Sequence, residues 1–214
     1  SLNKYKGKVC FTRSINHQEQ LLRDIDFIPA TLCEPGLYYV ENAVDSVCLS
    51  PRHPLIQTMV ADKALLDQAG LFDESFLAAE DAELIFRLSF LGGFLYVDRP
   101  LTTIYENSEN SLTYSKNILF QARRNQSYLR LSAHMYWRLS EISPEKLPLM
   151  RKLLGYYISR RAELACAAGH VPVARALAKD GIFFAANFGD FARCAGVLMC
   201  PRLVRSRARR KWLF

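Results

Sequence analysis

Asp81 is the residue whose type and setting in this sequence best fit a chemical role. It precedes the apolar Leu84 and Ile85 by three and four positions, so on a helix it shares their face. A carboxylate on an apolar face is costly unless it is paired or lines a cavity. The first turn of a helix favours its ionised form, which in a cleft can act as a general base. A second interpretation stays open from this pattern alone: a plain helix-start residue that is solvated or caps the helix.

The helix that would carry Asp81 is predicted within residues 70–105. A turn that starts at Gly70 leads into it, and we expect the helix to begin near residues 76–79. Glu83 and Arg87 are expected on another face as a solvated pair, four residues apart. The apolar residues recur at helical spacing and predict a buried stripe of Leu84, Ile85, Leu88 and Leu91.

Strands are predicted on both sides of this helix. Gly92 and Gly93 end the helix, because glycine accepts the left-handed conformation of a helix stop. Residues 94–97 and 101–105 are predicted strands around a turn at residues 98–100. Upstream, the pattern of residues 53–70 predicts a strand that runs into a short helix ending in glycine.

The ordered run of these features resembles the carboxyl-terminal half of the catalytic domain of family 2 glycosyltransferases. The match rests on Gly70-Leu71-Phe72-Asp73-Glu74, the pair Glu80-Asp81, an Arg-Leu in the helix, a glycine break and Tyr-Val-Asp-x-Pro-Leu, and it covers residues 50–113 best. The resemblance implies an α/β fold, a partial GT-A half-domain, with an all-α helical hairpin as an appendage. It implies that Asp81 deprotonates the acceptor hydroxyl during inverting sugar transfer. It also implies substrate-binding roles for Glu80, His53 and Thr58.

The resemblance also implies the substrates and the cofactor. The donor is a nucleotide-diphospho-sugar, and the acceptor is a glycan or a lipid-linked molecule of bacterial surface polysaccharide or glycolipid synthesis. A divalent cation, Mg or Mn, is expected in the full-length enzyme, with its ligands mostly outside this chain. Asp24 and Asp26 form an acid-x-acid pair, but metal-binding acids of the family lie further upstream, so we expect a polar loop there. Many relatives carry Arg-x-His where this sequence has Tyr105, Glu106 and Asn107.

Composition and cysteine usage set the broad class. Half of the 214 residues are apolar and 23% are charged, as in ordinary globular proteins. No apolar run reaches 18 residues and no signal peptide is recognised, so we expect no membrane span and no export signal. The sequence does not begin with methionine, and we expect an amino-terminal portion to be missing. The nucleotide-binding half is not recognised, so residues 1–214 alone are expected to be inactive. The six cysteines show no C-x-x-C pair and are interpreted as reduced thiols.

The remainder of the sequence predicts helices. We expect one at residues 116–140, a break at Ser143-Pro144, and a close-packed pair at 145–168 and 171–186, like one unit of a tetratricopeptide repeat. The alanines expected to face each other in this pair are Ala162, Ala165, Ala168, Ala174 and Ala178. The predicted domains are residues 1–115, the GT-A half-domain; 116–190, the helical appendage; and 191–214, a basic amphipathic tail.

The net charge of +7 comes from the last 24 residues, which hold seven cations and no acid. Residues 201–214 place Val204, Ala208 and Trp212 on one stripe among arginines. This pattern fits an anionic membrane surface or a disordered tail, and both interpretations stay open. A cytoplasmic protein, peripheral on the inner face of the membrane, is the expected location. No nucleic acid is expected as partner, because the body lacks a recognised nucleic-acid motif. The alternative function is a catalytically inactive relative that binds a protein through its helical hairpin.

Overall fold

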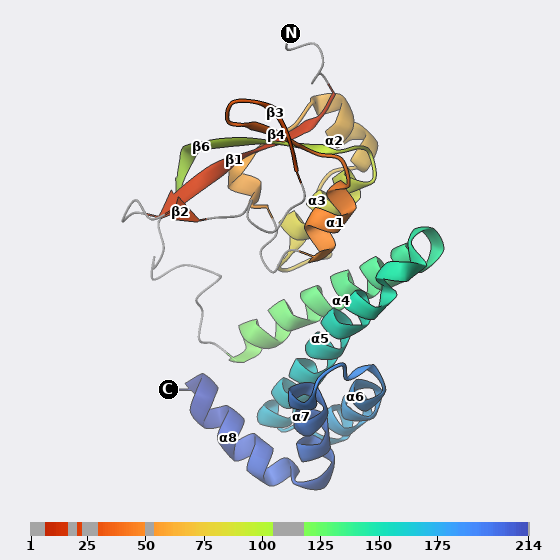
Figure 1. Ribbon diagram of the computed structural model, residues 1–214. Helices are drawn as coiled ribbons and strands as arrows, with labels where there is room; N and C mark the ends of the chain where they lie inside the picture. Colours follow the sequence, from red (N-terminus) through yellow and green to blue (C-terminus); the bar gives the residue numbers. More distant parts are fainter. Residues whose placement is uncertain (1–6, 17–20, 23–29, 50–53, 105–117, 214) are drawn as a thin grey trace. The chain divides into compact units, whose positions relative to one another are not determined.

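The computed structural model describes residues 7–16, 21–22, 30–49, 54–104 and 118–213, and the chain divides into two compact units (Figure 1). The first unit comprises residues 1–76 and 80–109, and the second comprises residues 77–79 and 110–214. The first is an α/β unit and the second is helical. No helix in the described part of the chain is long and apolar enough to cross a membrane.

A mixed β-sheet forms the centre of the first unit. Its strand order is β2-β1-β6-β4-β3, and β5 pairs with β1 beside β2. The strands are β1 (Val9–Asn16), β2 (Leu21–Leu22), β3 (Thr31–Glu34), β4 (Leu37–Val40), β5 (Met59–Val60) and β6 (Phe94–Ile104). β1 and β6 are parallel, whereas β4 runs antiparallel to β6. The α/β class expected from the sequence is therefore confirmed.

The long strand β6 differs from the prediction. Residues 94–104 form one strand rather than two strands around a turn at 98–100. Its pairing with β1 shifts register between Thr12 and Ser14, so that Arg13 pairs with Pro100. A bulge absorbs extra residues and tolerates a proline, which cannot donate to the ladder. Asp98, inside this irregular stretch, forms an ion pair with Arg13, and its amide donates to the carbonyl of Gly36 at 2.8 Å.

Helices complete the first unit. They are α1 (Ala43–Leu49), α2 (Lys63–Ala69) and α3 (Glu80–Ser89), with the 3-10 helix η3 (Ile56–Thr58) before β5. α3 packs against α1 and α2, and α1 and α3 lie below the sheet in Figure 1. Leu84, Ile85 and Leu88 are buried, as the helical spacing predicts. The helix begins at Glu80, later than expected, and ends before Leu91.

The second unit consists of helices. They are α4 (Ile118–Ile142), a 3-10 turn (Pro144–Lys146), α5 (Leu147–Ala168), α6 (Val171–Phe184), α7 (Phe188–Met199) and α8 (Pro201–Leu213). The break at Ser143-Pro144 and the helix pair that follows are confirmed. Gly169 ends α5 with a φ of 96°, a conformation that favours glycine.

Small side chains allow α5, α6 and α7 to pack closely. The buried cluster contains Ala162, Ala165, Cys166, Ala174, Ala178, Cys194 and Val197. Four of the five alanines expected at this contact belong to it, and Ala168 is half-buried. Cys194 and Val197 lie on α7, and Val204 of α8 packs against the same cluster. The helical packing thus includes residues of the segment 191–214 and extends beyond the expected hairpin.

Candidate functional site

Asp81 lies in the first turn of α3. Its side chain is half-buried, whereas Ile85, one turn further along, is wholly buried. Asp81 therefore lies at the edge of the apolar face rather than within it. Its Oδ1 accepts a hydrogen bond from the backbone amide of Ala82 at 2.7 Å. Within the described ranges it forms no ion pair with a cation.

The other acids of the same helical turn have different settings. Glu80 is exposed. Glu83 is buried at 7% exposure and is paired with Arg87, so the expected solvated pair is wrong. Nε of Arg87 donates to both carboxylate oxygens of Glu83 at 2.8 and 3.0 Å, and Nη2 donates to Oε2 at 2.7 Å. Of the three acids, Asp81 alone is both half-buried and without an ion pair among the described residues.

Arg87 also binds the turn that precedes α3. Its guanidinium donates to the backbone carbonyls of Ala69, Gly70 (3.0 Å) and Leu71 (2.8 Å). These carbonyls belong to the last residue of α2 and to the two residues after it, and a helix leaves its last acceptors without intrahelical donors. The buried Glu83 orients the guanidinium, and the guanidinium ties the Gly70 turn to α3. The only signal for this contact in the sequence is a Glu-Arg pair that follows a glycine turn. The spacing of the two residues does not reveal that the pair is buried.

The backbone between the turn and Asp81 is sharply bent. Asp73 accepts hydrogen bonds from the amide and the hydroxyl of Ser75, and the carbonyl of Asp73 accepts from the amide of Phe76 at 3.0 Å. Ala79, directly before α3, has a φ of 62°. This left-handed conformation costs a non-glycine residue on the order of 1 kcal/mol, and such residues cluster at functional sites. The strained residue is two positions before Asp81.

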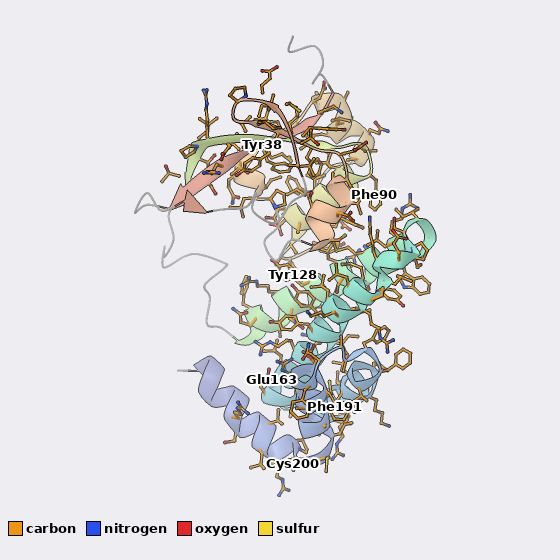
Figure 2. The ribbon with its side chains drawn as sticks, viewed as in Figure 1. Tyr38, Phe90, Tyr128, Glu163, Phe191 and Cys200 are labelled. Carbon is orange, nitrogen blue, oxygen red and sulfur yellow. The ribbon has the colours of Figure 1, made fainter. Side chains whose placement is uncertain are left out.

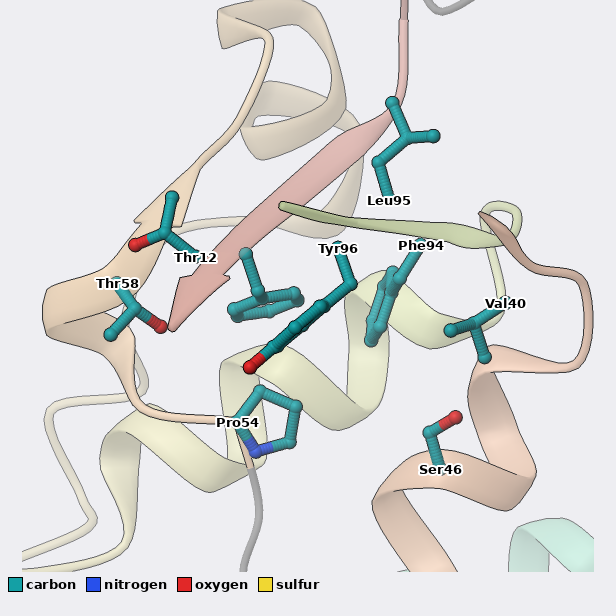
Figure 3. Close-up of a pocket in the computed structure, with 9 residues that line it drawn as sticks. Thr12, Val40, Ser46, Pro54, Thr58, Phe94, Leu95 and Tyr96 are labelled. Atoms are coloured by element: carbon teal, nitrogen blue, oxygen red, sulfur yellow. The ribbon is translucent and has the colours of Figure 1, made fainter. Parts of the chain in front are cut away.

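Of the predicted substrate-binding residues, Thr58 lines a small cavity that Asp81 does not line. Thr58 is buried, and its hydroxyl donates to the carbonyl of Leu55 at 2.8 Å. It lines a cavity of about 10 Å³, enough for one water, whose walls include the Tyr96 ring that reaches towards Pro54 (Figure 3). Neither Glu80 nor Asp81 lines this cavity, which is too small for a sugar. His53 lies outside the described residues.

The described residues offer no metal site. They contain no group of three or more His, Cys, Asp or Glu side chains that could hold an ion. Asp24 and Asp26 lie outside the described residues, as do the residues at the Arg-x-His position. The donor set of the described part therefore does not fit a divalent cation, and the expected cation with ligands elsewhere stays a prediction.

Comparison of the chain with protein-family models, curated proteins and solved structures found no match. The fold and the site therefore define a structural class but do not identify a protein family. The class is an α/β unit with a mixed sheet, joined in sequence to a unit of packed helices.

Proposed function

We propose that this chain is the carboxyl-terminal half of a GT-A catalytic domain of the family 2 glycosyltransferase type, followed by a helical appendage. The protein would transfer a sugar from a nucleotide-diphospho-sugar to an acceptor hydroxyl with inversion, in the synthesis of bacterial surface polysaccharide or glycolipid. The observation that carries the proposal is the setting of Asp81, a half-buried carboxylate without an ion pair in the described part of the chain.

The direction of α3 supports this role. A link of four residues, 90–93, turns the chain from α3 back into β6, so Asp81 lies at the end of the helix away from the start of β6. β6 is parallel to β1, and the carboxyl ends of parallel strands are the edge at which α/β sheets bind ligands. A helix of ten residues is about 15 Å long, so its first turn lies about that far from the start of β6, in the direction of the carboxyl end of this strand. The Glu83–Arg87 pair ties α3 to the turn at Gly70.

The chemistry assigned to this chain is one proton transfer. The carboxylate of Asp81 takes the proton of the acceptor hydroxyl, and the oxygen forms a bond to the anomeric carbon of the donor. The bond between that carbon and the diphosphate oxygen breaks, and the nucleoside diphosphate leaves from the opposite face, which inverts the anomeric configuration. Glu80, exposed beside Asp81, would orient the acceptor. A divalent cation would neutralise the diphosphate, but the described residues provide no ligands for it.

Product stereochemistry tests this proposal. The native polypeptide that contains residues 1–214 is incubated with nucleotide-diphospho-sugars and a crude glycan or lipid acceptor fraction. Release of nucleoside diphosphate, together with a product whose anomeric configuration is opposite to that of the donor by NMR, is the expected result. Retained configuration would contradict a single displacement with Asp81 as base. Residues 1–214 alone are expected to show no transfer.

A protein-interaction module is the second candidate, and exposed apolar side chains of the helical unit favour it. Phe188 is 83% exposed and Met199 is 80% exposed, and large exposed apolar residues are typical of contact surfaces when they cluster. Peripheral binding to an anionic membrane through residues 201–214, on the cytoplasmic side, is proposed as an accompanying property. Salt-sensitive binding to anionic vesicles would support it, and equal binding to neutral vesicles would contradict it.

A further inference from the structure

We propose that a groove in the second unit binds a phosphoryl group, as a phosphate monoester or a diphosphate. The groove lies where α5, α7 and α8 meet, and it has a volume of about 380 Å³. This volume falls within the usual range for small-ligand sites, roughly 300–1,000 Å³. Its lining, called the arginine groove below, is Arg160, Glu163, Gly189, Ala192, Arg193, Gly196, Val204 and Arg207. The inference is independent of the proposed sugar transfer.

The charges of the arginine groove favour an anion. Each of the three helices contributes one guanidinium: Arg160 from α5, Arg193 from α7 and Arg207 from α8. One carboxylate, that of Glu163, lines the groove with them. Glu163 belongs to α5 in the helical unit (Figure 2). Asp190 lies beneath at 2% exposure and adds a second negative charge. Three cations and two anions leave a net positive charge.

Arg193 is held in place by partners at one side of its guanidinium. Its Nη1 donates to the hydroxyl of Ser159 at 2.7 Å and to Oδ1 of Asp190 at 2.8 Å. Asp190 is itself fixed by the side-chain amide of Asn187, which donates to Oδ2 at 2.6 Å. A guanidinium has five N–H donors in a fixed fork. The network therefore positions Arg193 and leaves donors for a ligand on its groove side.

Glu163 is shared between two arginines. Nη1 of Arg160 donates to its Oε2 at 2.6 Å, and Nε of Arg193 lies 3.7 Å from the same oxygen. The longer distance is an ion pair without a hydrogen bond. One carboxylate thus only partly neutralises two guanidinium groups, which leaves positive charge for a bound anion.

Arg207 is the most accessible of the three cations. Its side chain is exposed and, in the ranges that the structure describes, forms no ion pair or hydrogen bond. Gly189, Ala192 and Gly196, which have small side chains or none, also line the groove. At Gly196 an added Cβ would lie 3.3 Å from the Val204 side chain, so a larger residue would narrow the space between them. Arg207 and Arg193, which come from two different helices, can therefore both donate to one ligand in the groove.

The chemistry of the donors points to phosphate rather than to a halide or a single carboxylate. Guanidinium groups form bidentate hydrogen bonds with phosphate oxygens, and a phosphate monoester carries up to two negative charges at neutral pH. Two sources supply this group: the headgroup of an anionic lipid and a soluble phosphate compound. The experiment below distinguishes them.

Titration of the complete chain with inorganic pyrophosphate tests the proposal. The ¹⁵N-labelled protein has ten glycines, so the amide signals of Gly189 and Gly196 are assignable probes inside the groove. We expect both signals to shift in a saturable way. Arg207→Ala should weaken binding about tenfold, as the loss of a charged hydrogen bond predicts. Arg202→Ala is the matched control: it removes an exposed arginine of the same helix that does not line the groove, and it should change the Kd less than about twofold.

A second variant, Glu163→Gln, should increase the affinity for pyrophosphate and tests the proposal independently of Arg207→Ala. It removes the competing charge but retains hydrogen-bonding capacity, so it should tighten pyrophosphate binding about threefold. Vesicles identify the source. If the ligand is a lipid headgroup, vesicles with phosphatidic acid bind more tightly than vesicles with phosphatidylglycerol, and Arg207→Ala removes the difference. If the ligand is soluble, pyrophosphate binds but neither vesicle shows a dependence on Arg207. Equal weakening by Arg202→Ala and Arg207→Ala, or no shift at Gly189 and Gly196, would overturn the proposal.

Discussion

Replacing Arg87 with alanine tests whether the buried ion pair holds the turn before α3. The substitution removes the hydrogen bonds to Glu83 and to the carbonyls of Ala69, Gly70 and Leu71. It leaves the Glu83 carboxylate, whose side chain is 9% exposed, without its cation. We therefore expect the loss of Arg87 to destabilise α3 and the turn together.

The expected magnitude follows from the burial of the pair. Breaking a buried ion pair by removing one partner costs about 3–5 kcal/mol. The Arg87 side chain is 27% exposed, so water can reach the site and the cost lies near the lower limit, about 3 kcal/mol. The double variant Glu83→Gln with Arg87→Met leaves no buried charge and should be more stable than Arg87→Ala by about 1 kcal/mol or more.

Native-state amide hydrogen exchange of residues 80–89 is the suitable assay. Trp137 and Trp212 both belong to the second unit, so tryptophan fluorescence does not report on the first. The control is Lys63→Ala, which breaks another pair four residues apart, Lys63–Asp67, with side chains 85% and 57% exposed. It should change the opening free energy by less than about 0.5 kcal/mol. An effect of Arg87→Ala as small as that of Lys63→Ala would refute the reasoning.

Three further predictions concern the helical unit. Gly155→Ala should destabilise it by about 2 kcal/mol, because the added carbon overlaps the carbonyl of Phe184; urea unfolding followed by tryptophan fluorescence measures this. Asp190→Asn should cost about 3 kcal/mol in the same assay, because it leaves Arg193 without its buried anion. Burial raises the pKa of the Cys194 thiol from 9.0 to about 11, so the folded state retains a proton that the unfolded state loses. Its contribution to stability is present below pH 9 and disappears as pH rises to 11.

These predictions have internal controls. Glu141→Gln breaks the exposed Arg138–Glu141 pair and should stay within about 0.5 kcal/mol of the wild type. Cys194→Ala should remove the thiol's share of the decline between pH 9 and 11. A wild type and a Cys194→Ala variant with parallel pH profiles would contradict the assigned pKa direction. A Gly155→Ala variant as stable as the wild type would show that α5 and α6 can separate at low cost.

The parts of the fold that the sequence predicts are those with local signals. The spacing of Leu84, Ile85 and Leu88 is set by the helix period, so their burial follows from the pattern. Ser143-Pro144 and Gly169 mark the limits of α5 because proline and glycine act through their own backbone geometry. The alanines at the contact of α5 and α6 are predicted from a local signal too, because they recur at facing positions of two predicted helices.

Features that depend on contacts distant in sequence could not be predicted. The spacing of Glu83 and Arg87 is the same for a solvated pair and for a buried one, and the contact with Ala69 decides between them. β6 continues through Pro100 because β1 accommodates the bulge, which the sequence of β6 alone does not reveal. α7 was not expected, although Asn187 caps it by accepting a hydrogen bond from the amide of Asp190.

The candidate site also has features that the sequence predicts and features that it does not. The place of Asp81 in a first turn follows from the sequence, and its position at the edge of the buried face is a result of the packing of α3. The expectation that Thr58 and Asp81 contact one substrate comes from the resemblance and stays a prediction. In the structure the Thr58 hydroxyl donates to the carbonyl of Leu55, and Thr58 lines a small cavity that Asp81 does not line.

The rate constant of sugar transfer by an Asp81→Asn variant of the native polypeptide tests the central claim most directly. At saturating donor and acceptor, we expect a rate constant about 10²–10⁴-fold lower than that of the wild type, since asparagine cannot accept the proton. Glu80→Gln, the neighbouring exposed acid, should lose less than about tenfold. Transfer by Asp81→Asn at the wild-type rate would contradict the assignment of this carboxylate as the base.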